Sequence, residues 1–269
     1  MFYRKNIESI QVSFSFLLLL ACLCFNIQVK AGEVIMATGD WCPYVCEPSS
    51  EEGKEGYLVE IMKNVFHKAG YKVTTQLLPY ARSIKLTRAG EIDGIIGVYR
   101  GDVPDFIFPV RHQGVSRNYF YTKRGVGWKF SGISSLKNIE RIGLVLGYDY
   151  GDSEFQLYID THPEKTVMTT GNKPFERNVS RLLLDRVDAI VEDDKVARYY
   201  FRKMGVSGQI SSAGAMGGHS RVYIVFSPAL PPEKSQKLTR ILTDGIVELR
   251  QSGQLAAIME KYGVGDWIK

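Results

Sequence analysis

The stretch GDWCPYVCEP, residues 39–48, combines two cysteines with a tryptophan, a tyrosine and two prolines. The thiols of Cys42 and Cys46 could serve a metal site, a redox pair or a disulfide-closed loop. The rings of Trp41 and Tyr44 could stack on a ligand. Two ligands are too few for a closed zinc site, and Cys-x₃-Cys is not the Cys-x-x-Cys of thiol oxidoreductases. We therefore expect a Cys42–Cys46 disulfide that holds the neighbouring rings in place.

The N-terminus carries the pattern of an export signal. A basic start precedes an uncharged apolar run over residues 12–27, and the small residue Ala31 follows it. This pattern predicts a secretory signal over residues 1–31, and in an oxidising compartment a disulfide is the default for the one remaining cysteine pair. The apolar run is short for a membrane span, which needs about 20 residues. An uncleaved anchor helix and a lipid anchor at Cys22 are the alternatives.

Composition and missing motifs exclude several classes of function. The net charge of +5 falls to about +3 without residues 1–31, and no dense stripe of Lys and Arg occurs, which argues against nucleic-acid binding. The four histidines are scattered and show no metal-ligand spacing. Neither HExxH nor GxSxG occurs. We therefore expect no catalytic set, no metal and no cofactor.

Strand and helix patterns alternate along the rest of the chain. Short apolar runs predict strands, and apolar residues at helical spacing predict the helices between them. A β-α-β-α-β series implies a mostly parallel sheet covered by helices, and a second series begins after residue 125. Strands are expected at 33–39, 72–79, 94–100, 141–146, 165–171, 187–193 and 221–228, helices at 56–71, 81–90, 152–163, 175–186 and 194–205, a loop at 214–219, and two terminal helices divided at 252–253 that pack on the first half.

Several short motifs follow one another in a specific order. An aromatic-x-Pro-aromatic group occurs at 41–44, and it is followed by GYLVEIMKNVFHKAGY, AGEIDGII and FIFP. The series continues with ISSLKNIERIGLVLGYDYG, RVDAIVEDDKVARYY and LRQSGQLAAIMEKYG. In this order they resemble the bacterial extracytoplasmic solute-binding proteins of family 3, the polar amino acid type. The resemblance covers nearly all of the chain after the signal.

The resemblance implies an α/β fold of the type II-like periplasmic binding proteins. Such a protein has two lobes, each a mostly parallel sheet with flanking helices, and two hinge strands join them. The hinge strands would lie near Asn118–Lys123 and Arg221–Ser227. The expected domains are a signal peptide at 1–31, lobe 1 at 32–122 plus 228–269, and lobe 2 at 123–227.

The resemblance also implies charged contacts to a zwitterionic solute. An arginine suits the carboxylate because its planar fork donates two parallel hydrogen bonds. Counting back from Pro109 assigns this role to Arg100, and Arg82 is a second candidate. Asp193 would pair with the solute ammonium. The alternatives are exposed arginines and a solvated acidic turn around Asp193, in which Glu192 and Asp194 flank it.

Aromatic and backbone contacts complete the expected site. Trp41 and Tyr80 would sandwich the solute side chain, with Tyr44 beside them at the cleft mouth. Core packing is the alternative for these rings. Gly147 and Tyr148 lead from a strand into a helix, where backbone N–H groups bind carboxylates.

The function expected from the resemblance is periplasmic capture of a small polar solute, an amino acid or a related compound. A monomer would deliver the solute to the membrane permease of an ABC importer. A solute-sensing module for a signalling membrane partner is one alternative. A periplasmic dehydratase-like enzyme is another, although no catalytic set supports it.

Overall fold

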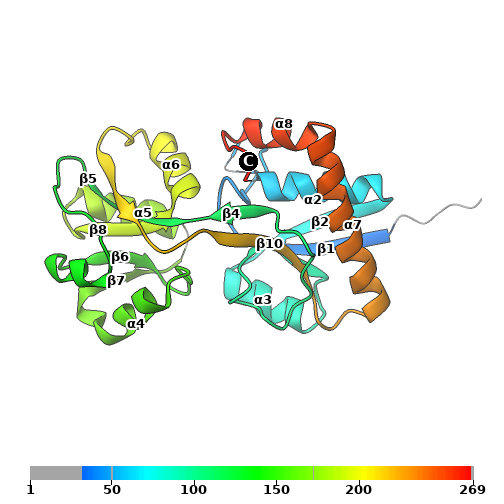
Figure 1. The fold of residues 1–269 in the computed structure, drawn as a ribbon, viewed down its shortest axis with the longest axis horizontal. Helices are drawn as coiled ribbons and strands as arrows, with labels where there is room; N and C mark the ends of the chain where they lie inside the picture. Colours follow the sequence, from blue (N-terminus) through cyan, green and yellow to red (C-terminus); the bar gives the residue numbers. More distant parts are fainter. Residues whose placement is uncertain (1–31, 50, 172, 268–269) are drawn as a thin grey trace, which may run out of the picture. The chain divides into compact units, whose positions relative to one another are not determined.

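The computed structural model describes residues 32–49, 51–171 and 173–267, so the signal expected at residues 1–31 lies outside the described residues. Two five-stranded sheets form the framework (Figure 1). The first sheet holds β1 (Gly32–Thr38), β2 (Tyr71–Leu77), β3 (Gly94–Val98), β4 (Gly114–Ser116) and β10 (Ser220–Phe226), in the order β2-β1-β3-β10-β4. The second holds β5 (Asn118–Lys123), β6 (Ile142–Val145), β7 (Thr166–Thr169), β8 (Ala189–Asp193) and β9 (Ile210–Ala215), in the order β7-β6-β8-β5-β9.

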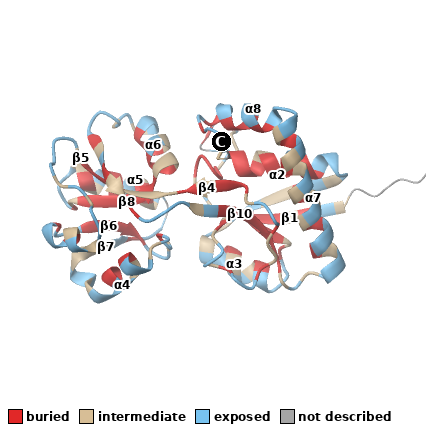
Figure 2. Cartoon of the chain, in the orientation of Figure 1, coloured by how far each residue is buried: buried red, intermediate tan, exposed pale blue. Residues whose placement is uncertain are grey.

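Each sheet combines parallel and antiparallel strands. In the first sheet β1 and β3 are parallel, and β10 runs antiparallel to both β3 and β4. In the second sheet β6 is parallel to β7 and β8, and β5 runs antiparallel to β8 and β9. The almost continuous apolar sequences of β6, β8 and β10 suit strands that are covered on both faces, and these strands are largely buried (Figure 2). The predicted α/β class is confirmed.

The chain crosses between the two sheets twice. It leaves β4 and enters β5 through Arg117, and it returns from β9 to β10 through residues 216–219. The segments expected as hinge strands therefore lie inside sheets: among the described strands, β5 pairs with β8 and β9 of the second sheet, and β10 pairs with β3 and β4 of the first. The expected lobe boundaries, at 122/123 and 227/228, lie further along the chain than these crossovers and remain a prediction as domain limits.

Helices cover both faces of each sheet. On the first sheet, α2 (Tyr57–Lys68), α7 (Pro232–Gln251) and α8 (Gln254–Lys261) pack together on one face, and α3 (Tyr80–Arg88) packs on the other. Gly245 of α7 lies so close to α2 that an added Cβ would stand 2.3 Å from Val65. On the second sheet, α5 (Pro174–Leu183) and α6 (Asp194–Lys203) lie in one core cluster and α4 (Ser153–Thr161) in another. Two short 3₁₀ helices span Ile133–Asn138 and Pro163–Lys165.

Most expected elements are present, with ends shifted by a few residues. The loop expected at 214–219 is wrong at its start, because Gly214 and Ala215 belong to β9 and pair with β5. Gly214 has φ 123°, and a Cβ there would lie 2.7 Å from the Phe130 carbonyl, so this strand position requires glycine. β4 was not predicted, because a three-residue strand carries no periodicity. In the described part of the chain, no helix has the length and apolarity needed to cross a membrane.

Candidate functional site

A hollow of about 1280 Å³ is lined by residues from both sheets. Tyr99 and Arg100 reach it from the loop after β3, and Tyr223 reaches it from β10. The opposite wall is the segment 145–153, which follows β6. Ligands of open α/β sheets bind beyond the carboxyl ends of the strands, which is where the loops after β3 and β6 lie. The hollow exceeds the roughly 300–1,000 Å³ of ordinary ligand pockets, so it has room for a small solute and water.

The lining carries both signs of charge. Arg100 and Arg221 are exposed cations, and Asp149 and Asp152 come from the loop after β6. The Arg100 guanidinium lies 4.0 Å from the centre of the Phe108 ring. Among the described residues Arg100 forms no salt bridge. A guanidinium that lies on a ring and forms no salt bridge within the described part of the chain can receive a carboxylate.

Three of the expected contacts, Arg100, Gly147 and Tyr148, line this hollow. Gly147 is exposed and has φ 84°, so the turn after β6 favours glycine there. The Tyr148 side chain is half-buried. Burial raises the pKa of its hydroxyl well above the ordinary value, and the Glu192 carboxylate adds to this effect.

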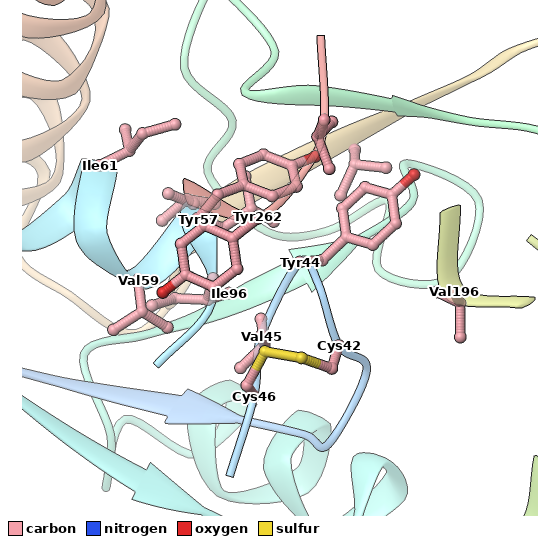
Figure 3. Close-up of a cluster of buried hydrophobic side chains, with 14 of the residues drawn as sticks. Cys42, Tyr44, Val45, Cys46, Tyr57, Val59, Ile61, Ile96, Val196 and Tyr262 are labelled. Carbon is pink, nitrogen blue, oxygen red and sulfur yellow. A yellow bond between two sulfur atoms is a disulfide. The ribbon is translucent and has the colours of Figure 1, made fainter. Parts of the chain in front are cut away.

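The expected disulfide joins Cys42 to Cys46, and both cysteines are buried. The bridge closes a turn in which the Trp41 ring stacks on Tyr44, with 4.0 Å between ring centres and 10° between ring planes. Tyr99 meets Trp41 edge-on at 6.0 Å, so this aromatic group adjoins the lining of the hollow. In Figure 3 the Tyr44 ring projects away from the disulfide.

Asp193 is fully buried and already binds protein donors. Its carboxylate accepts hydrogen bonds from the Tyr44 hydroxyl at 3.1 Å and from the Arg117 amide at 3.0 Å. It also caps α6 by accepting from the amides of Lys195 and Val196. Burial raises the pKa of Asp193, and the Lys195 ammonium opposes that shift. Asp193 thus ties the disulfide loop to α6, and its role toward a solute stays a prediction.

Tyr80 and Arg82 lie apart from the other expected contacts. Both belong to α3, and neither lines the hollow. The Tyr80 hydroxyl donates a hydrogen bond to Asp102, and Arg82 is exposed. Burial raises the pKa of Asp102, and Asp149 from the opposite wall of the hollow raises it further. The structure therefore brings Arg100, and not Arg82, to the hollow.

Glu192 was not predicted as a site residue, because from the sequence it was considered only as a neighbour of Asp193. The alternative of a solvated acidic turn is wrong for Glu192 and Asp193, which are 2% and 0% exposed. Glu192 Oε1 accepts from the Asp193 amide at 2.9 Å, and Oε2 has no hydrogen-bond partner among the described residues. Burial raises the pKa of Glu192 to about 8. The apolar residues 189–191 precede Glu192 in β8, and this run was the one sequence signal that Glu192 is buried.

Two α/β sheets, joined by two crossovers and lining a shared hollow, define a two-lobed solute-binding protein. The chain belongs to the bacterial extracellular solute-binding proteins, family 3, whose sequence profile matches residues 34–265. The predicted family and its solute-binding function are thus confirmed.

The individual proteins similar to this chain share 15% to 25% of its sequence. The arginine-binding extracellular protein ArtP of Bacillus subtilis (strain 168) is 25% identical over 254 residues, which are 92% of this chain and 93% of the relative. A histidine kinase sensor domain with similarity to periplasmic binding proteins is 18% identical, has a TM-score of 0.69, and is matched over 88% of this chain and 100% of its own. An ancestral amino acid-binding protein, a precursor of cyclohexadienyl dehydratase, is 15% identical, with a TM-score of 0.65 and coverage of 87% and 96%. These two structures establish the fold alone.

Proposed function

We propose that the protein captures an amino acid or a related polar compound in the hollow between its sheets, and that it is not an enzyme. The observation that carries the proposal is the composition of the hollow, in which guanidinium groups from the first sheet and carboxylates from the second face one space. A zwitterion needs both charges, and charge-assisted hydrogen bonds are the strong contacts available to it.

The carboxylate end of the solute is assigned to Arg100 and Arg221. Phe108 and Tyr223 lie 4.0 Å and 5.4 Å from the Arg100 guanidinium and limit where it can point. On the opposite wall the Tyr148 backbone N–H already donates to the Val145 carbonyl, so the backbone N–H assigned to the solute there is that of Gly147. A solute that contacts both walls stabilises the form in which they are close together, and hinge rotation would occur at the crossovers Arg117 and 216–219.

The proposed setting is the periplasm. Residues 1–31 would direct export and be removed, and the remaining lobes would act as a monomer. The solute-loaded form would dock on the membrane permease of an ABC importer. One relative is an arginine-binding protein, and two similar structures contain bound glutamate or histidine, which supports an amino-acid-like solute.

A sensor is the second candidate, because one similar structure is a histidine kinase sensor domain. Import and sensing differ in one measurable respect. Deletion of the gene should abolish uptake of the radiolabelled solute if the protein serves import, whereas a sensor mutant should retain uptake and lose a transcriptional response to the solute.

Thermal-shift screening of the exported protein tests solute capture. A solute at about 100 times its Kd stabilises the folded state by about 2.7 kcal/mol, which raises the Tm by roughly 5–10 °C for a chain of this size. The panel should contain amino acids, polyamines and small organic acids. A panel without any stabilising compound would contradict the proposed function.

The same assay decides between the two candidate clamps. Arg100→Ala should remove most of the ligand-induced shift, because Arg100 lines the hollow. Arg82→Ala removes an equal charge from the exposed side of α3 and should leave the shift intact. The reverse result would assign the carboxylate to Arg82 and disprove the assignment of the hollow.

A further inference from the structure

Three carboxyl groups, here called the acidic cluster, lie near the hollow at the ends of strands. Asp40 follows β1, Glu192 lies at the end of β8, and Glu176 lies in the first turn of α5, directly after β7. They act on one another: Asp40 raises the pKa of Glu176, and Glu176 raises that of Glu192. Carboxylates from both sheets therefore converge on one place.

Aromatic rings surround the acidic cluster. The indole N–H of Trp41 acts on Glu192 as a hydrogen-bond donor and lowers its pKa, which favours its charged form. The Tyr200 hydroxyl lies 3.4 Å from Asp40 Oδ1. Tyr148 experiences the charges of all three carboxyls and also lines the hollow, so the cluster adjoins the proposed solute site. Aromatic faces beside carboxylates are the surroundings that organic cations prefer.

Glu192 is the member of the cluster that the protein leaves unsatisfied. Its side chain is 2% exposed, and no donor among the described residues meets hydrogen-bond geometry with Oε2. A buried carboxyl oxygen without a donor is costly, and such a group calls for an explanation. The Oε2 atom, which has no hydrogen-bond partner among the described residues, can therefore accept a hydrogen bond from a solute.

The chain also lacks a matching positive charge. Among the described residues, no member of the acidic cluster forms a salt bridge. Lys203 acts on Asp40 and Glu176, yet its ammonium is paired with Glu51. Lys173 also acts on Glu176 but lies at the exposed N-cap of α5. The cluster therefore carries more acid than its basic neighbours balance.

We propose that the acidic cluster binds an ammonium or guanidinium group of the solute, with Glu192 as its main acceptor and Trp41 and Tyr148 as its aromatic walls. The inference rests on the proposed function, because it names the chemical class of the captured solute. That class is an amino acid with a cationic side chain or a related polyamine. Arg100 and Arg221 would hold the carboxylate end, where there is one, and the acidic cluster the cationic end.

A cationic solute should release a proton from the protein when it binds, and a neutral solute should not. With its pKa raised to about 8, Glu192 holds a proton at pH 7 in the solute-free protein. A bound cation favours the carboxylate, so that proton is released on binding. The titratable and charged groups around Glu192 are Asp193 on its own strand, Glu176 from α5, Tyr148 and Tyr150 from the loop after β6, and Tyr99 from the loop after β3.

Isothermal titration calorimetry at pH 7 tests the inference with matched solute pairs. Arginine and citrulline differ in charge at nearly constant shape, as do lysine and norleucine, and putrescine, glutamine and glutamate complete the panel. We expect at least one cation to bind more than about tenfold tighter than its neutral partner. Its binding heat should differ between Tris and phosphate by the ionisation enthalpy of up to about one proton.

Variants distinguish a direct role of Glu192 in solute binding from a general effect on the fold. Glu192→Gln should weaken binding of the cation at least about tenfold and abolish the buffer dependence of its heat. Glu176→Gln, in the first turn of α5, should also weaken it and serves if Glu192→Gln does not fold. Glu248→Gln removes an equal charge from an exposed helix position, where Glu248 pairs with Lys68, and should change nothing.

Each outcome of the titrations is decisive. If only neutral or acidic compounds bind, the protein captures a solute but the cation site is disproved. The same holds if cations bind without proton release and Glu192→Gln and Glu176→Gln bind them as tightly as the wild type. If no compound in the panel or in the thermal-shift screen binds, the proposed function fails and the inference fails with it.

Discussion

In the proposed cation site, Glu192 is the residue on which binding would most depend. Its carboxyl is withdrawn from water, and burial raises its pKa from the ordinary 4.5 to about 8. Asp193 and Glu176 add to this by like-charge repulsion. The solute-free protein therefore holds at Glu192 a proton that the unfolded chain would lose well below pH 7.

This proton links stability to pH. Between pH 4.5 and about 8 the folded state binds more protons at Glu192 than the unfolded state, so the free energy of unfolding falls as the pH rises. Glu192→Gln removes this dependence. We expect the variant to gain stability relative to the wild type from pH 5 to pH 8.5, by at most about 5 kcal/mol. Urea unfolding at both pH values measures it, and parallel pH profiles of the two proteins would refute the assignment.

Individual contact residues could be predicted only where they lie at a fixed number of residues from a sequence motif. Arg100 could be located from its distance to Pro109, and the structure places it in the hollow. Glu192 could not be distinguished from Asp194, because both are acids in one short run and only tertiary packing buries the first. Tyr80 fits the motif spacing, yet its hydroxyl is bound to Asp102 outside the hollow.

At the scale of elements, the disulfide loop connects the two sheets. It carries Trp41 beside Glu192 and holds Tyr44 on Asp193. Further along, Glu51 accepts hydrogen bonds from the side chains of α6. A loop fixed at so many points can present an aromatic ring to a solute at little entropic cost, which is the general basis of preorganisation.

Removal of the bridge tests this view. The double substitution Cys42→Ser and Cys46→Ser opens a very small loop, so the loop-entropy model predicts a loss of only about 2 kcal/mol in folding free energy. We expect the variant to stay folded at 20 °C, as circular dichroism would show, and to bind its solute roughly tenfold more weakly. An unchanged affinity together with a lowered Tm would make the bridge a structural staple and nothing more.

The elements themselves were largely predictable, because their signals are local. α2 combines apolar residues at helical spacing with a glycine shortly after its end, and its buried face follows from that pattern. β9 (sequence ISSAGA) has no apolar alternation, and it is a strand only because β5 provides its hydrogen-bond partners. Pairing between distant segments is not visible in a single sequence, which is why β4 and β9 were missed.

At the scale of the whole molecule, function follows from one chain contributing to two sheets. Because β10 belongs to the first sheet and β9 to the second, the return crossover places residues 219–221 in the lining of the hollow. The walls therefore come from both sheets, and any solute that touches both couples its binding to their relative movement. This coupling would let a membrane partner distinguish the loaded protein from the empty one.

A crystal structure of the protein with its stabilising solute tests the central claim, capture in the hollow, most directly. The account predicts density for the solute between the Arg100 guanidinium and the wall formed by Gly147 and Tyr148, with a cationic group within hydrogen-bond distance of Glu192. Solute density at another place, or a solute that contacts residues of only one sheet, would contradict it.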